Sequence, residues 1–212
     1  MTLEELSSKL TDLHHQMRSC RKCLDAGHQI IPKAIFSGPA SANVMIIGQA
    51  PGTTEVEAGR PFNASSGKRL FEWLGRAGFN EAVFRSNEYM TSVTKCFPGK
   101  AKNGSGDRVP TREERALCSS FLHAELKLVQ PRLVIPVGRL AINHFYPAKD
   151  PLFKIIGTAK KVERFDVIPL PHPSGASRWH QIQTNRGLID QAIKLIARYR
   201  KQIYRDALGA RL

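Results

Sequence analysis

Apolar residues recur along the chain at the two spacings that distinguish helices from strands. Apolar side chains at helical spacing from Leu3 to Met17, after the capping box Thr2-Leu3-Glu4-Glu5, predict a helix over residues 2–19. Helical patterns also predict helices over residues 67–78 and 111–128, between 137 and 145, and in a long final segment that includes 189–199. Short apolar runs predict buried strands at residues 44–47, 89–94, 133–137 and 166–170.

Strands that alternate with helices predict a parallel sheet with helices on both faces. We therefore expect one three-layer α/β/α domain over residues 1–212, with a central four-stranded parallel sheet. In such folds ligands bind at the carboxyl ends of the strands. The loops after the first, second and fourth strands are therefore the expected place for a functional site.

The chain is strongly basic, with 32 Lys and Arg residues against 18 acidic residues and a formal net charge of +14. Such a field attracts polyanions, and nucleic acid gains from counterion release on contact. Charge alone leaves three readings open: a nucleic-acid partner, anionic lipid, or a basic protein with neither. No apolar run approaches the ~20 residues of a membrane span, and no apolar signal core follows Glu4 and Glu5. We expect a cytoplasmic monomer without membrane contact.

The loop after the first predicted strand combines two glycines and a proline, which open the backbone for close approach to a ligand. Its first residues are Gly48, Gln49, Ala50, Pro51 and Gly52. Further along, Glu55 is the nearest carboxylate, and Phe62 is an aromatic ring on which a flat base can stack. The alternatives are that Glu55 is a solvated loop charge and that Phe62 is an ordinary core aromatic.

The loop after the fourth predicted strand places His172 between two prolines, which restrict its backbone and favour one ring orientation. A lone histidine is often structural, but this context makes His172 a candidate catalytic group. The small and polar residues that follow are candidates for phosphate contact, and they are Ser174, Gly175, Ser177 and Arg178.

Four cysteines, Cys20, Cys23, Cys96 and Cys118, complete the candidate chemistry. In a reducing compartment they are not expected to form structural disulfides. Four thiolates can hold one metal centre, and the alternative is four unrelated thiols.

Three sequence blocks in register resemble the motifs of the iron–sulfur-containing uracil-DNA glycosylases. The first block reads Gly48-x-Ala50-Pro51-Gly52-x-x-Glu55-x-x-x-Gly59-Arg60-Pro61-Phe62. The second reads Thr91-Ser92-Val93-Thr94-Lys95-Cys96-x-Pro98, followed by Arg108-x-Pro110, Glu114 and Cys118. The third reads His172-Pro173-Ser174, and the match runs from Cys20 to about Ser177.

The resemblance implies a monofunctional enzyme that excises uracil from DNA in a bacterial cytoplasm, where DNA binding would associate it with the nucleoid. It implies that the four cysteines hold a [4Fe–4S] cluster. Our own hypothesis is that His172 supports the leaving base and that Phe62 stacks on it. We also expect Gly48 and Ala50 to border the base, while Pro51 and Gly52 meet the DNA. The basic segment 99–107 has no histidine, so we expect none of the covalent DNA crosslinking of a related group.

Three positions depart from the resembled pattern and suggest an atypical member. Gln49 stands where glutamate is usual, which leaves Glu55 as the remaining candidate to activate water. Ser92 replaces a base-reading asparagine, so one hydroxyl stands in place of an amide. Asn63 follows Phe62 at a position where valine is usual, and it is a candidate to supply that amide.

These departures leave two other functions open. One is a catalytically weak protein of the same fold that binds damaged or single-stranded DNA. The other is a glycosylase for another deaminated base, such as hypoxanthine.

Overall fold

The computed structural model describes residues 1–102, 106–175 and 177–209. Over these residues the strands form one mixed sheet in the order β2-β1-β3-β5-β4. The strands are β1 (Val44–Gly48), β2 (Tyr89–Ser92), β3 (Leu133–Pro136), β4 (Lys160–Val162) and β5 (Phe165–Val167). The predicted strands are therefore confirmed in place, and they pair in parallel as β2-β1-β3-β5.

The prediction of a purely parallel four-stranded sheet was wrong, because β4 adds an antiparallel edge. Val162 pairs with Phe165, and the tight turn between them places Glu163 at a positive φ of 47°. Lys160 and Lys161 make β4 polar and exposed, so it carries no apolar run by which sequence inspection could find it. Lysines on an edge strand also discourage pairing with another sheet.

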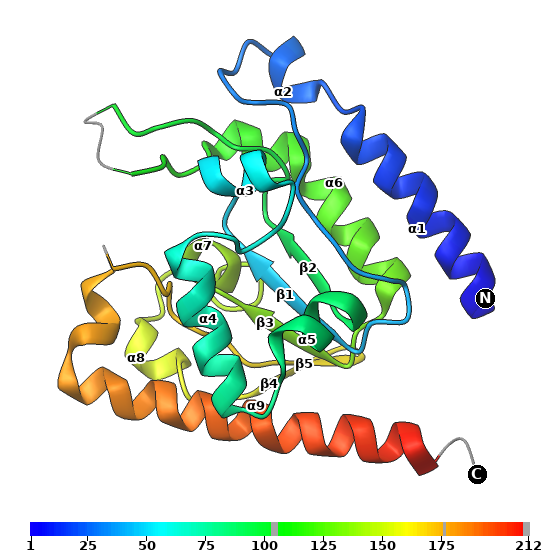
Figure 1. The fold of residues 1–212 in the computed structure, drawn as a ribbon. Coiled ribbons are helices and arrows are strands. Elements are labelled where there is room, and N and C mark those ends of the chain that lie inside the picture. The colour runs from blue at the N-terminus through cyan, green and yellow to red at the C-terminus, as the bar shows by residue number, and fades with distance from the viewer. Residues whose placement is uncertain (103–105, 176, 210–212) are drawn as a thin grey trace.

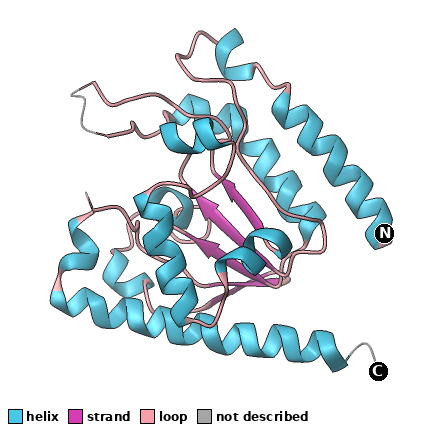
Figure 2. Ribbon diagram, viewed as in Figure 1, coloured by secondary structure: helices cyan, strands magenta, loops and turns pink. Residues whose placement is uncertain are grey.

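Helices cover both faces of the sheet, as expected (Figures 1 and 2). The helices are α1 (Leu3–Arg18), α2 (Lys22–Asp25), α3 (Thr53–Ala58), α4 (Ser65–Arg76), α5 (Glu81–Asn87), α6 (Arg112–Val129), α7 (Arg139–Ile142), α8 (Leu152–Ile155), the 3-10 turn η1 (Arg178–Gln181) and α9 (Gln183–Gly209). Helices α1 and α6 pack together on one face, and α4 and α9 pack together on the other. Within the described ranges, no helix is long and apolar enough to cross a membrane.

Each face of the sheet has its own apolar core, because alternate residues of the buried strands point in opposite directions. Val44 and Ile46 of β1 pack toward α4 and α9, whereas Met45 and Ile47 pack toward α1 and α6. The sheet is thereby fixed between two layers, and the loops at its carboxyl edge are positioned by a rigid base.

Local signals predicted the long helices and failed at the short ones. Helix α1 begins with the expected capping box, in which the Thr2 hydroxyl accepts from Glu5 N–H and the Glu5 carboxylate accepts from Thr2 N–H. The helix expected to reach residue 145 ends at Ile142 as α7. The N–H groups of residues 144 and 145 turn back to carbonyls three residues earlier, and Pro147 has no N–H to extend the helix.

Candidate active site

A pocket of about 420 Å³ opens at the carboxyl ends of β1 and β2, where the loop that follows β5 also arrives. This volume suits a small organic ligand. The predicted site residues that line it are Gly48, Gln49, Ala50, Pro51, Gly52, Glu55, Phe62, Ser92, His172 and Ser174. His172 and Phe62, which are far apart in sequence, thus lie in one pocket.

The floor of the pocket is formed where Gly48 of β1 pairs in register with Ser92 of β2. The Phe62 ring lies directly against Gly48, since a Cβ added there would come within 3.1 Å of the ring carbon Cζ. Any side chain at position 48 would push the ring away. The glycine is therefore required by the position of the aromatic ring.

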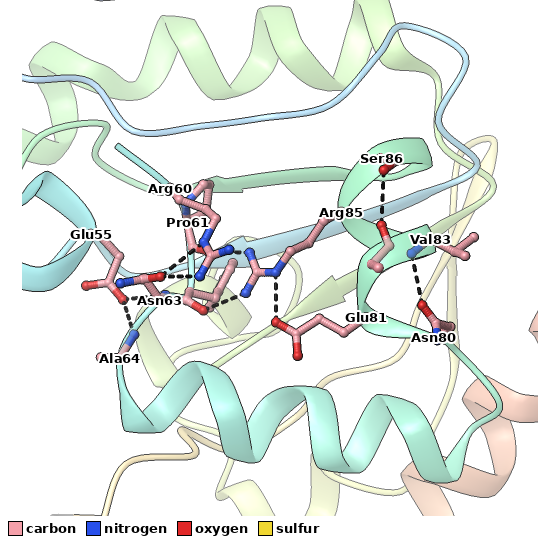
Figure 3. A network of polar contacts seen from close by, with 12 residues as sticks. Glu55, Arg60, Pro61, Asn63, Ala64, Asn80, Glu81, Val83, Arg85 and Ser86 are labelled. Carbon is pink, nitrogen blue, oxygen red and sulfur yellow. Dashed lines mark hydrogen bonds and ion pairs between the residues drawn. The ribbon is translucent and has the colours of Figure 1, made fainter. Parts of the chain in front are cut away.

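Phe62 is held in an uncommon backbone conformation, with a positive φ of 51°. Its carbonyl accepts from Arg85 Nη2 at 2.9 Å, and the neighbouring Pro61 carbonyl accepts from Arg85 Nη1 at 2.8 Å (Figure 3). The Arg85 guanidinium also lies 4.4 Å from the centre of the Phe71 ring and binds Glu81. Strain of this kind persists only when surrounding contacts hold it, and it often marks functional sites. Sequence inspection gave no sign of this clamp, because Arg85 lies on α5, outside the motifs.

Glu55 is buried and braces the pocket loop (Figure 3). Its Oε1 accepts from the backbone N–H groups of Asn63 at 2.8 Å and Ala64 at 3.0 Å. Its Oε2 accepts from Gly52 N–H at 3.1 Å and from the Thr54 hydroxyl at 3.2 Å. Both carboxylate oxygens are therefore engaged in joining the two ends of this loop.

The His172 ring is fixed on two sides. Its Nδ1 accepts from the Ser174 backbone N–H at 3.2 Å and lies 2.9 Å from the Ser174 hydroxyl. Its Cδ2 side packs on Gly138, where an added Cβ would lie 3.1 Å away. Burial, with the His180 imidazole nearby, lowers the pKa of His172. A neutral ring whose Nδ1 accepts carries its proton on Nε2.

Asp107 is a pocket carboxylate that sequence inspection did not single out. A Cβ added at Gly52 would lie 2.6 Å from Asp107 Oδ2 and 2.9 Å from Glu55 Oε2, so both carboxylates flank this glycine. Asp107 Oδ1 pairs with Lys100 Nζ at 2.7 Å. Within the described ranges, Oδ2 has no hydrogen-bond partner, and neither does the side-chain amide of Gln49. In the sequence, the only sign of Asp107 is its position at the end of the basic segment 99–107.

Besides the four cysteines, four predicted site residues lie outside the pocket lining. The Asn63 side-chain oxygen accepts from Arg60 Nε at 3.0 Å, so its amide is directed toward that guanidinium. Gly175, Ser177 and Arg178 follow Ser174 in the chain, and Arg178 begins the turn η1. Trp179, the next residue, packs against the apolar core beside α9.

A buried polar network lies directly behind the pocket, between β2 and α6. Lys95 Nζ binds Glu125 Oε2 at 2.6 Å, and both side chains are at most 2% exposed. Glu125 Oε1 accepts from the hydroxyls of Tyr89 at 3.1 Å and Thr91 at 2.9 Å. His14 Nε2 completes the network at 2.8 Å from the Tyr89 hydroxyl. Sequence inspection missed all of it, because a lone lysine and glutamate 30 residues apart carry no spacing signal.

The four cysteines line a second, mainly apolar cavity, to which Thr94 and Lys95 also contribute. Lys95 N–H donates to Cys118 Sγ at 3.3 Å. Burial and the neighbouring thiols raise the pKa of Cys23 to about 11 and that of Cys96 to about 12, so bare thiols stay protonated. Within the described residues, no three His, Cys, Asp or Glu side chains are placed to hold a single metal ion.

Comparison with known proteins identifies the family of the chain. The family model described as the uracil DNA glycosylase superfamily matches residues 35–196, and the chain belongs to this family. It is 35% identical over 133 residues to a type-4 uracil-DNA glycosylase of Pyrobaculum aerophilum, a match that covers 62% of each chain. It is 31% identical over 173 residues to the Archaeoglobus fulgidus protein of that name, covering 78% of this chain and 81% of the relative. The Thermotoga maritima type-4 uracil-DNA glycosylase is 28% identical over 179 residues, covering 82% and 84%.

Proposed function

We propose that this protein is a monofunctional DNA glycosylase that hydrolyses the N-glycosidic bond of uracil in DNA, the first step of base excision repair. The observation that carries the proposal is the single pocket that joins the His172 imidazole and the Phe62 ring. Family membership, relatives named type-4 uracil-DNA glycosylase and a net charge of +14 support it.

A base inside a duplex is out of reach, so the target nucleotide must rotate out of the helix into the pocket. There the base stacks on Phe62, with Gly48 and Ala50 at its edge. The rim residues then meet the DNA backbone, and they are Pro51, Gly52, Ser174, Gly175, Ser177 and Arg178. Backbone N–H groups, hydroxyls and one guanidinium suit phosphate contact.

His172 stabilises the departing base. Uracil leaves as an anion, and a donor aimed at the oxygen where charge develops lowers the barrier. The neutral ring, with Nδ1 engaged by Ser174, presents its Nε2 proton to that oxygen. No proton transfer is needed, because the hydrogen bond itself strengthens as the anion forms.

Asp107 and Gln49 act on the water that attacks the sugar carbon. Because backbone N–H groups already engage both oxygens of Glu55, we assign Glu55 to holding the loop and assign the free oxygen of Asp107 to the water. A carboxylate here also balances the positive charge that develops on the sugar. Lys100 lines the pocket, but its ammonium is paired with Asp107, so we expect neither a Schiff base nor strand cleavage.

Cys20, Cys23, Cys96 and Cys118 would hold a [4Fe–4S] cluster, which serves here as a structural brace. Four thiolates are the ligand set of such a cluster. A single zinc ion needs its ligands within ~2.3 Å of one point. The support for the cluster is that all four cysteines line one cavity. Purified protein should be brown and carry about four irons per chain. A colourless protein that contains zinc would contradict this assignment.

A labelled oligonucleotide with one uracil tests the function. We expect an abasic product that breaks only after alkali treatment. His172→Ala should slow excision by about 10²–10³-fold, as for loss of one donor to a developing anion. His123→Ala, which removes an exposed imidazole on α6, should leave excision unchanged. Tight binding without base release would favour a DNA-binding protein instead.

The same assay separates the two carboxylates. Asp107→Asn should slow excision by about 10²-fold or more while the melting temperature changes little, because Asp107 is exposed. Glu55→Gln should lower the melting temperature, because it weakens the hydrogen bonds that join the loop. Full excision by Asp107→Asn would remove Asp107 from the mechanism.

A further inference from the structure

The carbonyl of Pro173, the residue after His172, is bound by a side chain of helix α4. Arg69 Nη1 donates to this carbonyl at 2.7 Å, although the two residues are 104 positions apart in the chain. Pro173 is buried and has no N–H, so the carbonyl is its only polar group. A guanidinium always keeps its protons, and hydrogen bonds from a charged donor are stronger than those between neutral groups. The bond therefore joins the loop that carries the His172 imidazole to a regular helix.

A second imidazole orients the guanidinium. Arg69 Nη1 lies 3.4 Å from His180 Nε2, which must be the acceptor because an arginine N–H can only donate. Burial, with Arg69 and Arg186 nearby, lowers the pKa of His180, so its ring is neutral at neutral pH and can accept. The His180 ring also packs edge to face with Trp73, which follows Arg69 by one turn of α4, and the ring centres are 6.1 Å apart. Two successive turns of α4 thus hold this group of side chains together.

Helix α4 also contacts the opposite wall of the pocket. A Cβ added at Gly67 would overlap the Phe62 carbonyl, so the first turn of α4 packs directly on the backbone of Phe62. Arg69 follows two residues later. One helix therefore fixes both the aromatic ring and the loop of the imidazole, and it sets the distance between them.

We propose that Arg69 is a positioning residue that holds the His172 imidazole in the place from which it stabilises the leaving base. The inference rests on the proposed glycosylase function and adds a residue that is not among the described residues lining the pocket. A donor lowers the barrier only if it is aimed at the oxygen where charge develops. The prolines on either side of His172 restrict its backbone, but they do not attach the loop to the core. Arg69 supplies that attachment through the Pro173 carbonyl.

Single-turnover excision of uracil in two backgrounds tests the proposal. Arg69→Met keeps an unbranched side chain but removes the donor. In the wild-type background it should slow excision by about tenfold, the value of one hydrogen bond from a charged group. In the His172→Ala background it should cost little further, because Arg69 acts through that imidazole. An unchanged rate in Arg69→Met alone, or a full tenfold loss without His172, would overturn the proposal.

Binding distinguishes positioning from direct contact with DNA. A duplex that carries uracil on a 2′-fluoroarabino sugar resists cleavage, so its dissociation constant can be measured. Arg69→Met should leave this constant nearly unchanged, because the hydrogen bond from His172 gains its strength only as the anion forms. A loss of affinity as large as the loss of rate would mean that Arg69 contacts DNA, and this result would also overturn the proposal.

Arg76→Met is the matched control, because Arg76 lies two turns further along α4 and pairs with Asp190 of α9 at the surface. It should keep the wild-type rate in either background. The NMR signal of the His172 ring, identified by its loss in His172→Ala, should shift in Arg69→Met and stay in place in Arg76→Met. If the wild-type protein released no uracil, the glycosylase function would have failed, and this signal would still decide the positioning role. A ring signal that did not shift in Arg69→Met would overturn it.

Discussion

Strand β2 contributes to both the pocket and the interior network behind it, but the polar groups of the two regions differ in whether they have hydrogen-bond partners. In the pocket, the Gln49 amide, the His172 Nε2 and one oxygen of Asp107 have no hydrogen-bond partner within the described part of the chain. Behind β2, the Lys95 ammonium has three partners and the Glu125 carboxylate is fully engaged. Groups left without partners at the strand ends are available to a substrate.

The interior network has a different use. Paired polar groups in a low-dielectric interior are rigid, because separating the two partners would leave an uncompensated charge among apolar groups. Lys95 transmits this rigidity to the pocket through the Ser92 carbonyl, and to the cysteine cavity through its backbone N–H bond to Cys118. The comparison assigns positioning to the interior and chemistry to the pocket, and mutations can test that division.

The largest expected effect is on stability, from breaking the buried ion pair. Glu125→Gln leaves the Lys95 ammonium without its counter-charge, and we expect the free energy of unfolding to fall by about 3–5 kcal/mol. Urea denaturation measures this. Adding Lys95→Met removes the stranded charge, while the amide oxygen introduced by Glu125→Gln can still accept from Tyr89 and Thr91.

The double variant Lys95→Met with Glu125→Gln should therefore be more stable than Glu125→Gln alone. If the second change instead destabilised the protein further, the ammonium would not be the source of the cost, and the division between interior and pocket would lose its physical basis.

A smaller effect is expected where the scaffold holds the aromatic ring. Arg85→Lys keeps the charge but loses the fork that binds two carbonyls at once. Phe62 would then relax from its positive φ, and single-turnover excision should slow by about tenfold, the value of one to two hydrogen bonds.

The Phe62→Ala background shows whether Arg85 acts through the ring. There the added Arg85→Lys change should cost little further excision, because the two residues are coupled. A full tenfold loss in that background would mean that Arg85 acts elsewhere, for example on DNA.

The elements that sequence predicted are those set by local patterns. Helix α1 has a capping box, and β1 is a continuous apolar run, so both carry their signal within a few residues. The hairpin of β4 and β5 was half missed, since two lysines hide an edge strand. The short helices α3 and α5 were missed as well, because a helix of six or seven residues holds too few apolar positions to show a period.

The pocket was predicted better than the contacts that support it. Loop motifs led to Phe62 and His172, and the strand order brought them together. Asp107, Arg85 and the Lys95–Glu125 pair depend on which elements meet in space, and no spacing along the chain records that. For Glu55 the motif was found but its role was not. The sequence suggested a carboxylate that activates water, whereas in the structure this carboxylate accepts from backbone N–H groups of its own loop.

The smallest expected effect is a pH dependence that originates at the far end of the interior network. Burial, with Arg18 and His15 nearby, lowers the pKa of His14 from 6.5 to about 4. Between those values the unfolded chain binds a proton that the folded chain refuses, so the free energy of unfolding falls as the pH is lowered through this window. Urea denaturation at about pH 7 and about pH 5 should show a shallower pH dependence for His14→Gln than for wild type.

His15→Gln, which removes an exposed imidazole from the same helix, should keep the wild-type dependence. If His14→Gln kept it too, the imidazole would be protonated in the folded protein, and the interior would be less closed than the hydrogen bond to Tyr89 indicates.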